Sequence, residues 1–272
     1  MGKYLASEPS KALADLIAMK RHGEKISMVT CYDAAFARLV EKAGVDAVLV
    51  GDSLGNVVLG FDNTISVTMA AMTHHCAAVA RALKAPFLIA DMPFGSYRDT
   101  KLALENAVRL LQEGGAQAVK LEGGAEIVPQ TRALVSAGIP VVGHLGLTPQ
   151  KVHSLSGYRV QGRGMLASER LMKDALELEG AGASMLVLEL VPQNLAERVS
   201  KALSIPTIGI GAGPNTDGQV LVLHDLLGFD ESFCPKFLKR YASIGESVAA
   251  AISEYHQDVK AKKFPTDKHS FS

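Results

Sequence analysis

The sequence predicts a (β/α)8 barrel, a TIM barrel, that is preceded by a leading helix and covers residues 1–272 as one domain. Eight short apolar strands alternate with helical patterns, no Pro- or Ser-rich break divides the chain, and 272 residues suit this architecture. An open, doubly wound sheet is the structural rival, because sequence patterns leave the strand number uncertain by one or two.

The predicted strands are apolar runs that follow Gly- or Pro-containing turns. Pro86, Pro140 and Pro206 introduce three of them, at the strand start where proline is tolerated. The run that begins at Ala47 is apolar enough to be buried on both faces. We expect strands at 26–30, 47–52, 87–91, 118–122, 141–145, 185–190, 207–210 and 219–223.

Helical spacing of apolar residues links these strands. Leu13, Leu16 and Ile17 predict the leading helix, with Ser10 as its cap, and Ser168 is expected to cap a later helix. We expect helices at 10–20, 67–83, 102–113, 127–137, 193–203 and 236–260. Two more helices are expected, one that ends at Ala43 and one that begins at Ser168. The 146–164 link is long and rich in Gly, Ser, Lys and Arg, which indicates a functional loop or lid.

The composition narrows the class of ligand and the compartment. Lys plus Arg and Asp plus Glu both number 28, so no net basic charge indicates binding to nucleic acid or to an anionic membrane. Three scattered cysteines are too few for a disulfide framework and suit a reducing compartment. The first 19 residues mix charged and apolar residues and resemble neither a signal peptide nor a spanning helix. We therefore expect a cytoplasmic protein that acts on small molecules.

Four of the predicted strands carry an acidic residue at their C-terminal end or one position before it: Asp52, Asp91, Glu122 and Glu189. Active sites of barrel enzymes lie at the C-terminal ends of the strands. One carboxylate there is often only a cap or turn residue, but several at one barrel mouth repel one another unless a cation or protonation relieves them. Oxygen ligands without Cys or an HxxxH pair favour Mg2+ or Mn2+ over Zn2+. The pattern predicts a magnesium site.

A magnesium ion at this rim could chelate a 2-oxo acid through its carboxylate and keto oxygens and acidify the neighbouring carbon. A carboxylate that is not a metal ligand must then accept the proton. Glu189 comes from the sixth strand, across the barrel from strands two to four, and we assign it as the base.

Other polar residues near the rim carry open alternatives. Lys120 lies on the same strand face as Glu122. Three roles are open for it: binding an anionic substrate or enolate, pairing with an acid, or acting as a Schiff-base nucleophile. His144 donates to an oxyanion, orients a base, or is a satisfied rim histidine. Ser53 donates to a carboxylate or is a turn hydroxyl. The glycines at 209–213 are a weak phosphate-cradle motif or a tight turn.

Five blocks in order carry a specific resemblance: VGDSLG at 50–55, AVKLEGG at 118–124, GHLGLTPQ at 143–150, GYRVQGRG at 157–164 and GIGAGxxxDGQ at 209–219. HSF near the C-terminus adds to them. Together they resemble the ketopantoate hydroxymethyltransferase family, within the phosphoenolpyruvate/pyruvate barrel superfamily. The resemblance implies transfer of a one-carbon unit from 5,10-methylenetetrahydrofolate to 3-methyl-2-oxobutanoate, which gives 2-dehydropantoate for pantothenate biosynthesis. It also implies Mg2+ and a homodecamer of two stacked pentamers.

The resemblance implies roles for the rim residues. Asp52 and Asp91 resemble Mg2+ ligands that also frame the substrate, and Glu122 completes the metal shell directly or through water. By the same resemblance, Glu189 is the general base, and Ser53 and Lys120 hold the carboxylate side of the oxo acid.

Two residues depart from the family pattern, Phe61 where a histidine is frequent and Ser66 where a proline is common. Both belong to the loop after the second strand, so these departures bear on the conformation of that loop and on its contacts with folate. The alternative functions are a Mg2+-dependent lyase or aldolase acting on another 2-oxo acid, a metal-free Schiff-base aldolase, and a catalytically inactive barrel that binds ligands or partners.

Overall fold

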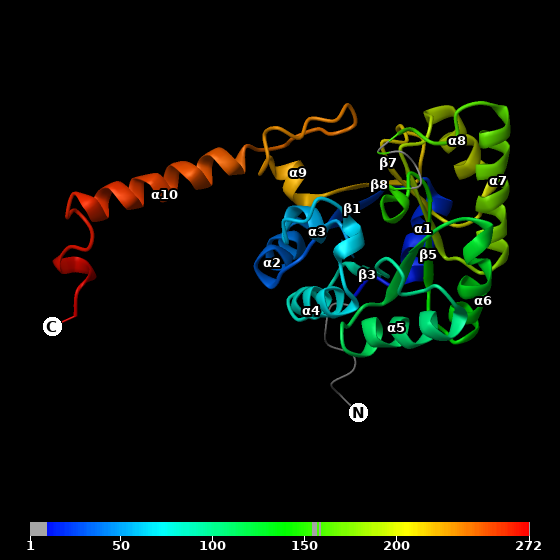
Figure 1. Ribbon diagram of the computed structural model, residues 1–272, viewed down its shortest axis with the longest axis horizontal. Helices are drawn as coiled ribbons and strands as arrows, with labels where there is room; N and C mark the ends of the chain where they lie inside the picture. Colours follow the sequence, from blue (N-terminus) through cyan, green and yellow to red (C-terminus); the bar gives the residue numbers. More distant parts are fainter. Residues whose placement is uncertain (1–9, 154–156, 158, 272) are drawn as a thin grey trace. The chain divides into compact units, whose positions relative to one another are not determined.

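The computed structural model describes residues 10–153, 157 and 159–271 (Figure 1). The chain divides into two compact units, Met1–Val222 and Leu223–Ser272, which we describe separately. That 1–272 forms one domain therefore stays a prediction.

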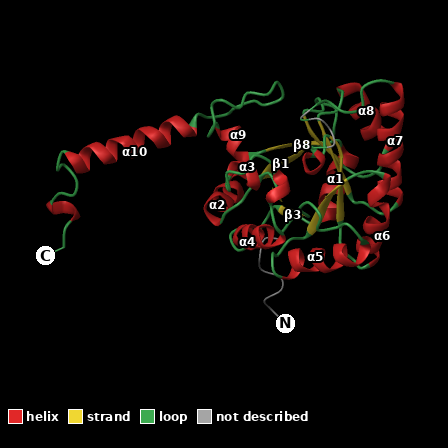
Figure 2. Ribbon diagram, in the orientation of Figure 1, coloured by secondary structure: helices red, strands yellow, loops and turns green. Residues whose placement is uncertain are grey.

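The first unit contains a closed barrel of eight parallel strands in the order β1 to β8, with β8 paired to β1 (Figure 2). The strands are β1 Ile26–Thr30, β2 Ala47–Val50, β3 Phe87–Asp91, β4 Ala118–Glu122, β5 Val141–Gly146, β6 Met185–Glu189, β7 Thr207–Ile210 and β8 Gly218–Leu221. The (β/α)8 prediction is confirmed, and closure excludes the open sheet.

Helices cover the outside of this barrel, as Figures 1 and 2 show for α4 to α8. In the first unit they are α1 Leu13–His22, α2 Ala34–Ala43, α3 Leu54–Val57, α4 Met69–Ala80, α5 Thr100–Gln112, α6 Val128–Ser136, α7 Met165–Gly180 and α8 Gln193–Ala202. Three 3-10 turns, η1 Thr64–Ser66, η2 Ala125–Ile127 and η3 Pro149–Lys151, lie in the loops after β2, β4 and β5.

Both serine caps predicted from the sequence are wrong. Helix α1 begins at Leu13, and the Asp15 carboxylate accepts the Ala12 N–H at 2.8 Å, so its first turn is capped from within the helix. Helix α7 begins at Met165, after Gly164 at φ 81°, a conformation that favours glycine. Ser168 therefore lies in the first turn of the helix and not ahead of it.

Several element boundaries also need correction. Strand β2 ends at Val50 and not at Asp52, because residues 51–53 turn into the unpredicted helix α3. Helix α4 is shorter than 67–83 because the Thr68 hydroxyl caps its first turn. Of the expected 236–260 helix, only 244–260 is helical. Residues 154–156 and 158 of the predicted loop or lid lie outside the described residues.

The leading helix closes the N-terminal end of the barrel. Leu16 is fully buried in one apolar cluster with strand-start residues that include Ile26 and Phe87. Lys20 pairs with Asp217 at 2.8 Å beside them. Because this end is filled with apolar side chains, the polar site has to lie at the opposite end of the strands.

The second unit contains α9 Leu223–Leu227, α10 Ile244–Lys260 and a 3-10 turn, η4 Asp267–His269. Helix α10 has no buried residue. Among the described residues, no helix is both long and apolar enough to span a bilayer.

Candidate active site

The strand register brings the predicted acids to one rim. Asp91 pairs with Lys120 across β3 and β4, Glu122 pairs with His144 across β4 and β5, and Gly146 pairs with Glu189 across β5 and β6. Gly146 permits this last approach, because an added Cβ would lie 2.1 Å from the Glu189 carbonyl oxygen.

Asp52 and Asp91 are adjacent at the bottom of the site. The backbone N–H of Asp52 donates to Asp91 Oδ2 at 2.9 Å, and both side chains are buried. Burial, followed by the charges of Asp91 and Glu122, raises the pKa of Asp52 well above its usual value. Burial also raises the pKa of Asp91, against the opposing effect of Lys120. Two desolvated carboxylates that repel each other form a site that favours a cation.

Lys120 supplies a positive charge within this cluster. Its Nζ lies 2.7 Å from Asp91 Oδ1 and 4.0 Å from Glu122 Oε1. Burial opposes its charge, but Asp91, Glu122 and Asp52 outweigh burial and raise the pKa of the ammonium group. The salt bridge considered from the sequence is therefore present. A Schiff-base nucleophile needs a neutral amine, so these acids work against that alternative.

His144 connects Glu122 with Glu189. Its Nδ1 lies 3.3 Å from Glu122 Oε1, and its Nε2 lies 3.2 Å from Glu189 Oε2. Burial and Lys120 oppose the charged ring, but the bonds to the two glutamates prevail and raise the pKa of His144 to about 9. The same bond lowers the pKa of Glu122, although burial alone would raise it. The protonated ring lies between the two carboxylates, within 3.3 Å of each, with Lys120 Nζ 3.2 Å from its Nδ1, and it can orient Glu189 by its charge.

Glu189 differs from the other acids in its exposure. Its side chain is 19% exposed, whereas that of Glu122 is 1% exposed. A carboxylate at the rim can contact both a ligand in the mouth and the buried imidazole behind it.

The Asp52–Asp91 pair fits a divalent cation. Mg2+ is usually held by one or two carboxylates and keeps water or substrate oxygens in its other positions. Among the residues that the structure describes, no group of three or more His, Cys, Asp or Glu side chains is arranged to hold a metal. The oxygens of Glu122 instead face the Gln150 N–H, at 3.0 Å, and His144. Its role as a third ligand stays a prediction.

Ser53 and the 209–213 segment complete the predicted set. The Ser53 Oγ lies 2.8 Å from the Tyr32 hydroxyl, in the turn that leads into α3. Residues 211–217 form a turn between β7 and β8 in which Gln219 Nε2 donates to the Gly213 carbonyl at 2.9 Å. This geometry agrees with the tight-turn interpretation.

Two residues of the site have no predicted role. Gln150 donates to Asp52 Oδ2 at 2.8 Å, and the Tyr97 hydroxyl donates to Gln150 Oε1 at 2.6 Å. Gln150 is part of the GHLGLTPQ block, so the sequence contained a signal for it. Tyr97 belongs to the loop after β3, and no pattern marked it.

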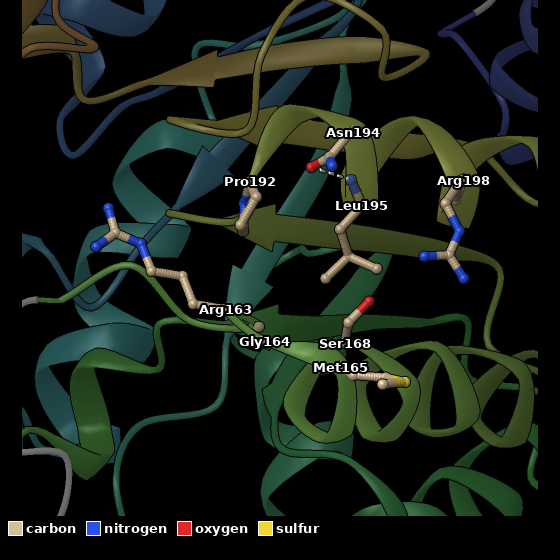
Figure 3. Close-up of a pocket in the computed structure, with 9 residues that line it drawn as sticks. Arg163, Gly164, Met165, Ser168, Pro192, Asn194, Leu195 and Arg198 are labelled. Atoms are coloured by element: carbon tan, nitrogen blue, oxygen red, sulfur yellow. Dashed lines mark hydrogen bonds between the residues drawn. The ribbon is translucent and has the colours of Figure 1, made fainter.

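A pocket of about 420 Å3 lies beside the end of β6 (Figure 3). The loop after β5 and the first turns of α7 and α8 line it, and Arg163 and Arg198 stand on opposite sides of it. In the described part of the chain, neither arginine has a carboxylate within ion-pair distance. Pro192, at its edge, is three residues beyond Glu189.

Comparison with known proteins yields one consistent family. The sequence model of ketopantoate hydroxymethyltransferase matches residues 10–267. The 3-methyl-2-oxobutanoate hydroxymethyltransferase of Moorella thermoacetica is 53% identical over 98% of this chain and 100% of its own length. That of Desulfotalea psychrophila is 52% identical, over 96% of this chain and 94% of its own.

Solved structures share the fold at low identity. Phosphonopyruvate hydrolase in complex with oxalate and Mg2+ matches with a TM-score of 0.63 and 12% identity, over 96% of this chain and 91% of that one. The 2,3-dimethylmalate lyase, a member of the PEP mutase/isocitrate lyase superfamily, matches with a TM-score of 0.59 and 16% identity, over 95% and 91%.

Proposed function

The chain belongs to the ketopantoate hydroxymethyltransferase family and is a hydroxymethyltransferase of the pantothenate pathway, and we propose that it works through the acid cluster at the barrel mouth. The substrates are 3-methyl-2-oxobutanoate and 5,10-methylenetetrahydrofolate, and the product is 2-dehydropantoate. The observation that carries the proposal is the His144 bridge, which links the buried cluster to the partly exposed carboxylate of Glu189. The family match over nearly the whole chain favours this transfer over the lyase alternative.

Asp52 and Asp91 would hold a divalent metal ion, with Mg2+ as our choice because both ligands are hard oxygen donors. When bound, the ion would hold the 2-oxo acid through its oxygens and stabilise the negative charge that develops on the keto oxygen. Glu122 stays our candidate for a further contact to this ion, directly or through water.

Lys120 and Ser53 would hold the carboxylate side of the oxo acid. The ammonium group stays charged because three acids surround it, so it can attract an anion once a cation relieves Asp91. The Tyr32 hydroxyl fixes the position of the Ser53 hydroxyl beside Asp52. A positive donor on β4 and a neutral donor in the turn after β2 are therefore available, with β3 between the two strands.

Glu189 would remove the proton from C3 of the oxo acid, as general base. Protonated His144 faces Glu189 Oε2 with its Nε2, at 3.2 Å, and leaves the other carboxylate oxygen available. The C3 carbon then forms a bond to the methylene carbon of the folate, both C–N bonds of that carbon break, and water supplies the hydroxyl group. The C3 proton and the second proton of the water end on N5 and N10 of the tetrahydrofolate that leaves. Preorganised charges that stabilise the enolate should contribute most of the acceleration.

The pocket beside β6 would receive the glutamate tail of the folate. It opens next to the strand that carries Glu189, and Arg163 and Arg198 offer guanidinium groups of the kind that bind carboxylates. Replacing Arg198 with Glu should raise the KM for the folate about tenfold, while C3 exchange without folate stays unchanged. Arg81→Glu, at the C-terminal end of α4, is the matched control and should change neither. An unchanged folate KM in Arg198→Glu would place the tail elsewhere.

The test of the proposed function is exchange of the C3 hydrogen of 3-methyl-2-oxobutanoate in deuterated water, followed by NMR. Glu189→Gln should slow exchange by about 10²- to 10⁴-fold and leave oxo acid binding largely intact. Glu179→Gln is a matched control, because that carboxylate caps the turn at Ser204 instead. Normal exchange in Glu189→Gln would show that another group is the base.

The metal-free alternative and the assembly are tested separately. Borohydride with the oxo acid should not label Lys120, and EDTA should abolish exchange; labelling together with resistance to EDTA would favour the Schiff-base aldolase. A homodecamer in the cytoplasm completes the proposal, and sedimentation of the purified protein measures the number of chains.

A further inference from the structure

Gln150 belongs to the loop after β5, yet it contacts the ends of three other strands. Its Nε2 donates to Asp52 Oδ2 at 2.8 Å and to the Met92 carbonyl at 2.9 Å. Its backbone N–H donates to Glu122 Oε2 at 3.0 Å. The residue is only 4% exposed. This single glutamine therefore fastens the loop to β2, β3 and β4 at the level of the acids.

Tyr97 determines which way the Gln150 amide points. The Tyr97 hydroxyl donates to Gln150 Oε1 at 2.6 Å, so the amide oxygen faces the phenol and the amide nitrogen faces Asp52 and the Met92 carbonyl. Rotating the amide by 180° would place its oxygen against the Met92 carbonyl, which has no proton to donate, and would remove the N–H that now donates to Asp52. The orientation is thus set by three partners.

We propose that Gln150 is a positioning residue for the metal site: it binds one oxygen of Asp52 and so presents the other oxygen to the cation. The inference rests on the proposed role of Asp52 as a metal ligand. It also connects that site with the loop after β5, because the same residue belongs to both.

The physical reason is that a carboxylate without a partner rotates about its terminal torsion, and binding a metal then requires ordering it. With Oδ2 bonded to Gln150 and the Asp52 N–H bonded to Asp91, both the backbone and the side chain of Asp52 are held. Groups that orient metal ligands in this way typically change metal affinity by about 10- to 100-fold when they are removed.

The test is titration of the metal-free protein with Mg2+ or Mn2+ by calorimetry. Gln150→Met keeps the length of the side chain but removes both donors, and it should raise the metal Kd by about 10- to 100-fold. Raising the Mg2+ concentration should restore part of the lost turnover, since the loss is mainly in metal binding. Gln117→Met is the matched control: Gln117 accepts the Leu88 N–H at the opposite end of the barrel, and its loss should leave metal affinity unchanged.

Tyr97→Phe gives a second route to the same answer, including the case in which Gln150→Met does not fold. It should weaken metal binding in the same direction but less. The double variant should bind metal little more weakly than Gln150→Met alone, because the shortest bond of the Tyr97 hydroxyl, at 2.6 Å, is to Gln150, and its contacts with the Glu122 backbone are longer, at 3.3 and 3.4 Å. Metal affinity that is unchanged in both single variants overturns the proposal. A wild-type protein that binds no divalent metal at all removes the metal site itself, which is a separate and distinguishable result.

Discussion

The two ends of the barrel have opposite construction. The N-terminal end is filled by Leu16 and the apolar residues that begin the strands, with ion pairs such as Lys20–Asp217 at its edge. The C-terminal end buries three carboxylates, an ammonium group and an imidazolium within a few ångströms. Burying charges is costly even when they are paired, whereas apolar burial is the main favourable contribution to folding. The comparison supports our proposal that the C-terminal end is the catalytic one, whereas the N-terminal end stabilises the fold.

Removing Lys120 should be the most damaging single change at the C-terminal end. Lys120→Met leaves Asp91, Glu122 and Asp52 without the ammonium group that lies among them. Loss of one partner of a buried ion pair typically costs about 3–5 kcal/mol of unfolding free energy. Urea unfolding at pH 7 of the metal-free variant measures this, and turnover should fall as well. A variant that is as stable as the unmodified protein would show that the acids are already protonated or solvated.

At the N-terminal end, shortening a buried apolar side chain should lower stability and leave turnover unchanged. Leu16→Ala removes a fully buried side chain and should cost about 2–5 kcal/mol, while kcat changes by less than about twofold. Leu166→Ala, at a side chain that is 83% exposed, is the matched control and should stay within about 0.5 kcal/mol. Loss of turnover in Leu16→Ala, measured well below its melting temperature, would mean that the two ends are coupled.

The C-terminal end should make stability depend on pH through His144. Its pKa is raised to about 9 in the folded protein, above the usual value of about 6.5 for histidine. The stabilisation is therefore fully present below about pH 6.5 and is lost as the pH rises through 9. Unfolding midpoints between pH 6 and 10 measure this, and His144→Gln should flatten the slope. An equally steep slope in His144→Gln would assign it to other groups.

The smallest effect is expected for the ion pair at the edge of the N-terminal end. Lys20 and Asp217 are both partly exposed, so Lys20→Met should cost about 1 kcal/mol or less and leave turnover unchanged. Unfolding at low and high salt checks whether the remaining contribution is electrostatic. A loss as large as that in Lys120→Met would erase the distinction between the two ends.

Much of this contrast could be predicted from the sequence. Strand ends are local patterns, and parallel strands share one rim, so Asp52, Asp91, Glu122 and Glu189 could be gathered without coordinates. The alternatives for His144 stayed open because its partners, Glu122 and Glu189, come from two neighbouring strands at a register that the sequence does not give.

Other features could not be predicted because they depend on long loops. Gln150 reaches Asp52 across 98 positions of sequence, and the orientation of its amide depends on Tyr97 from another loop. The two incorrect caps have a local cause instead. At Gly164 the backbone conformation, and not a serine hydroxyl, determines where α7 begins, and Asp15 replaces Ser10 at α1.

The most direct measurement is a crystal structure of the protein with Mn2+ and 3-methyl-2-oxobutanoate, with the metal located by its anomalous scattering. The prediction is one peak within bonding distance of the carboxylates of both Asp52 and Asp91, with Glu189 facing C3 of the oxo acid. A metal held elsewhere, with Asp91 still paired to Lys120 and Glu189 turned away from the ligand, would contradict the assignment of the C-terminal end as the catalytic one.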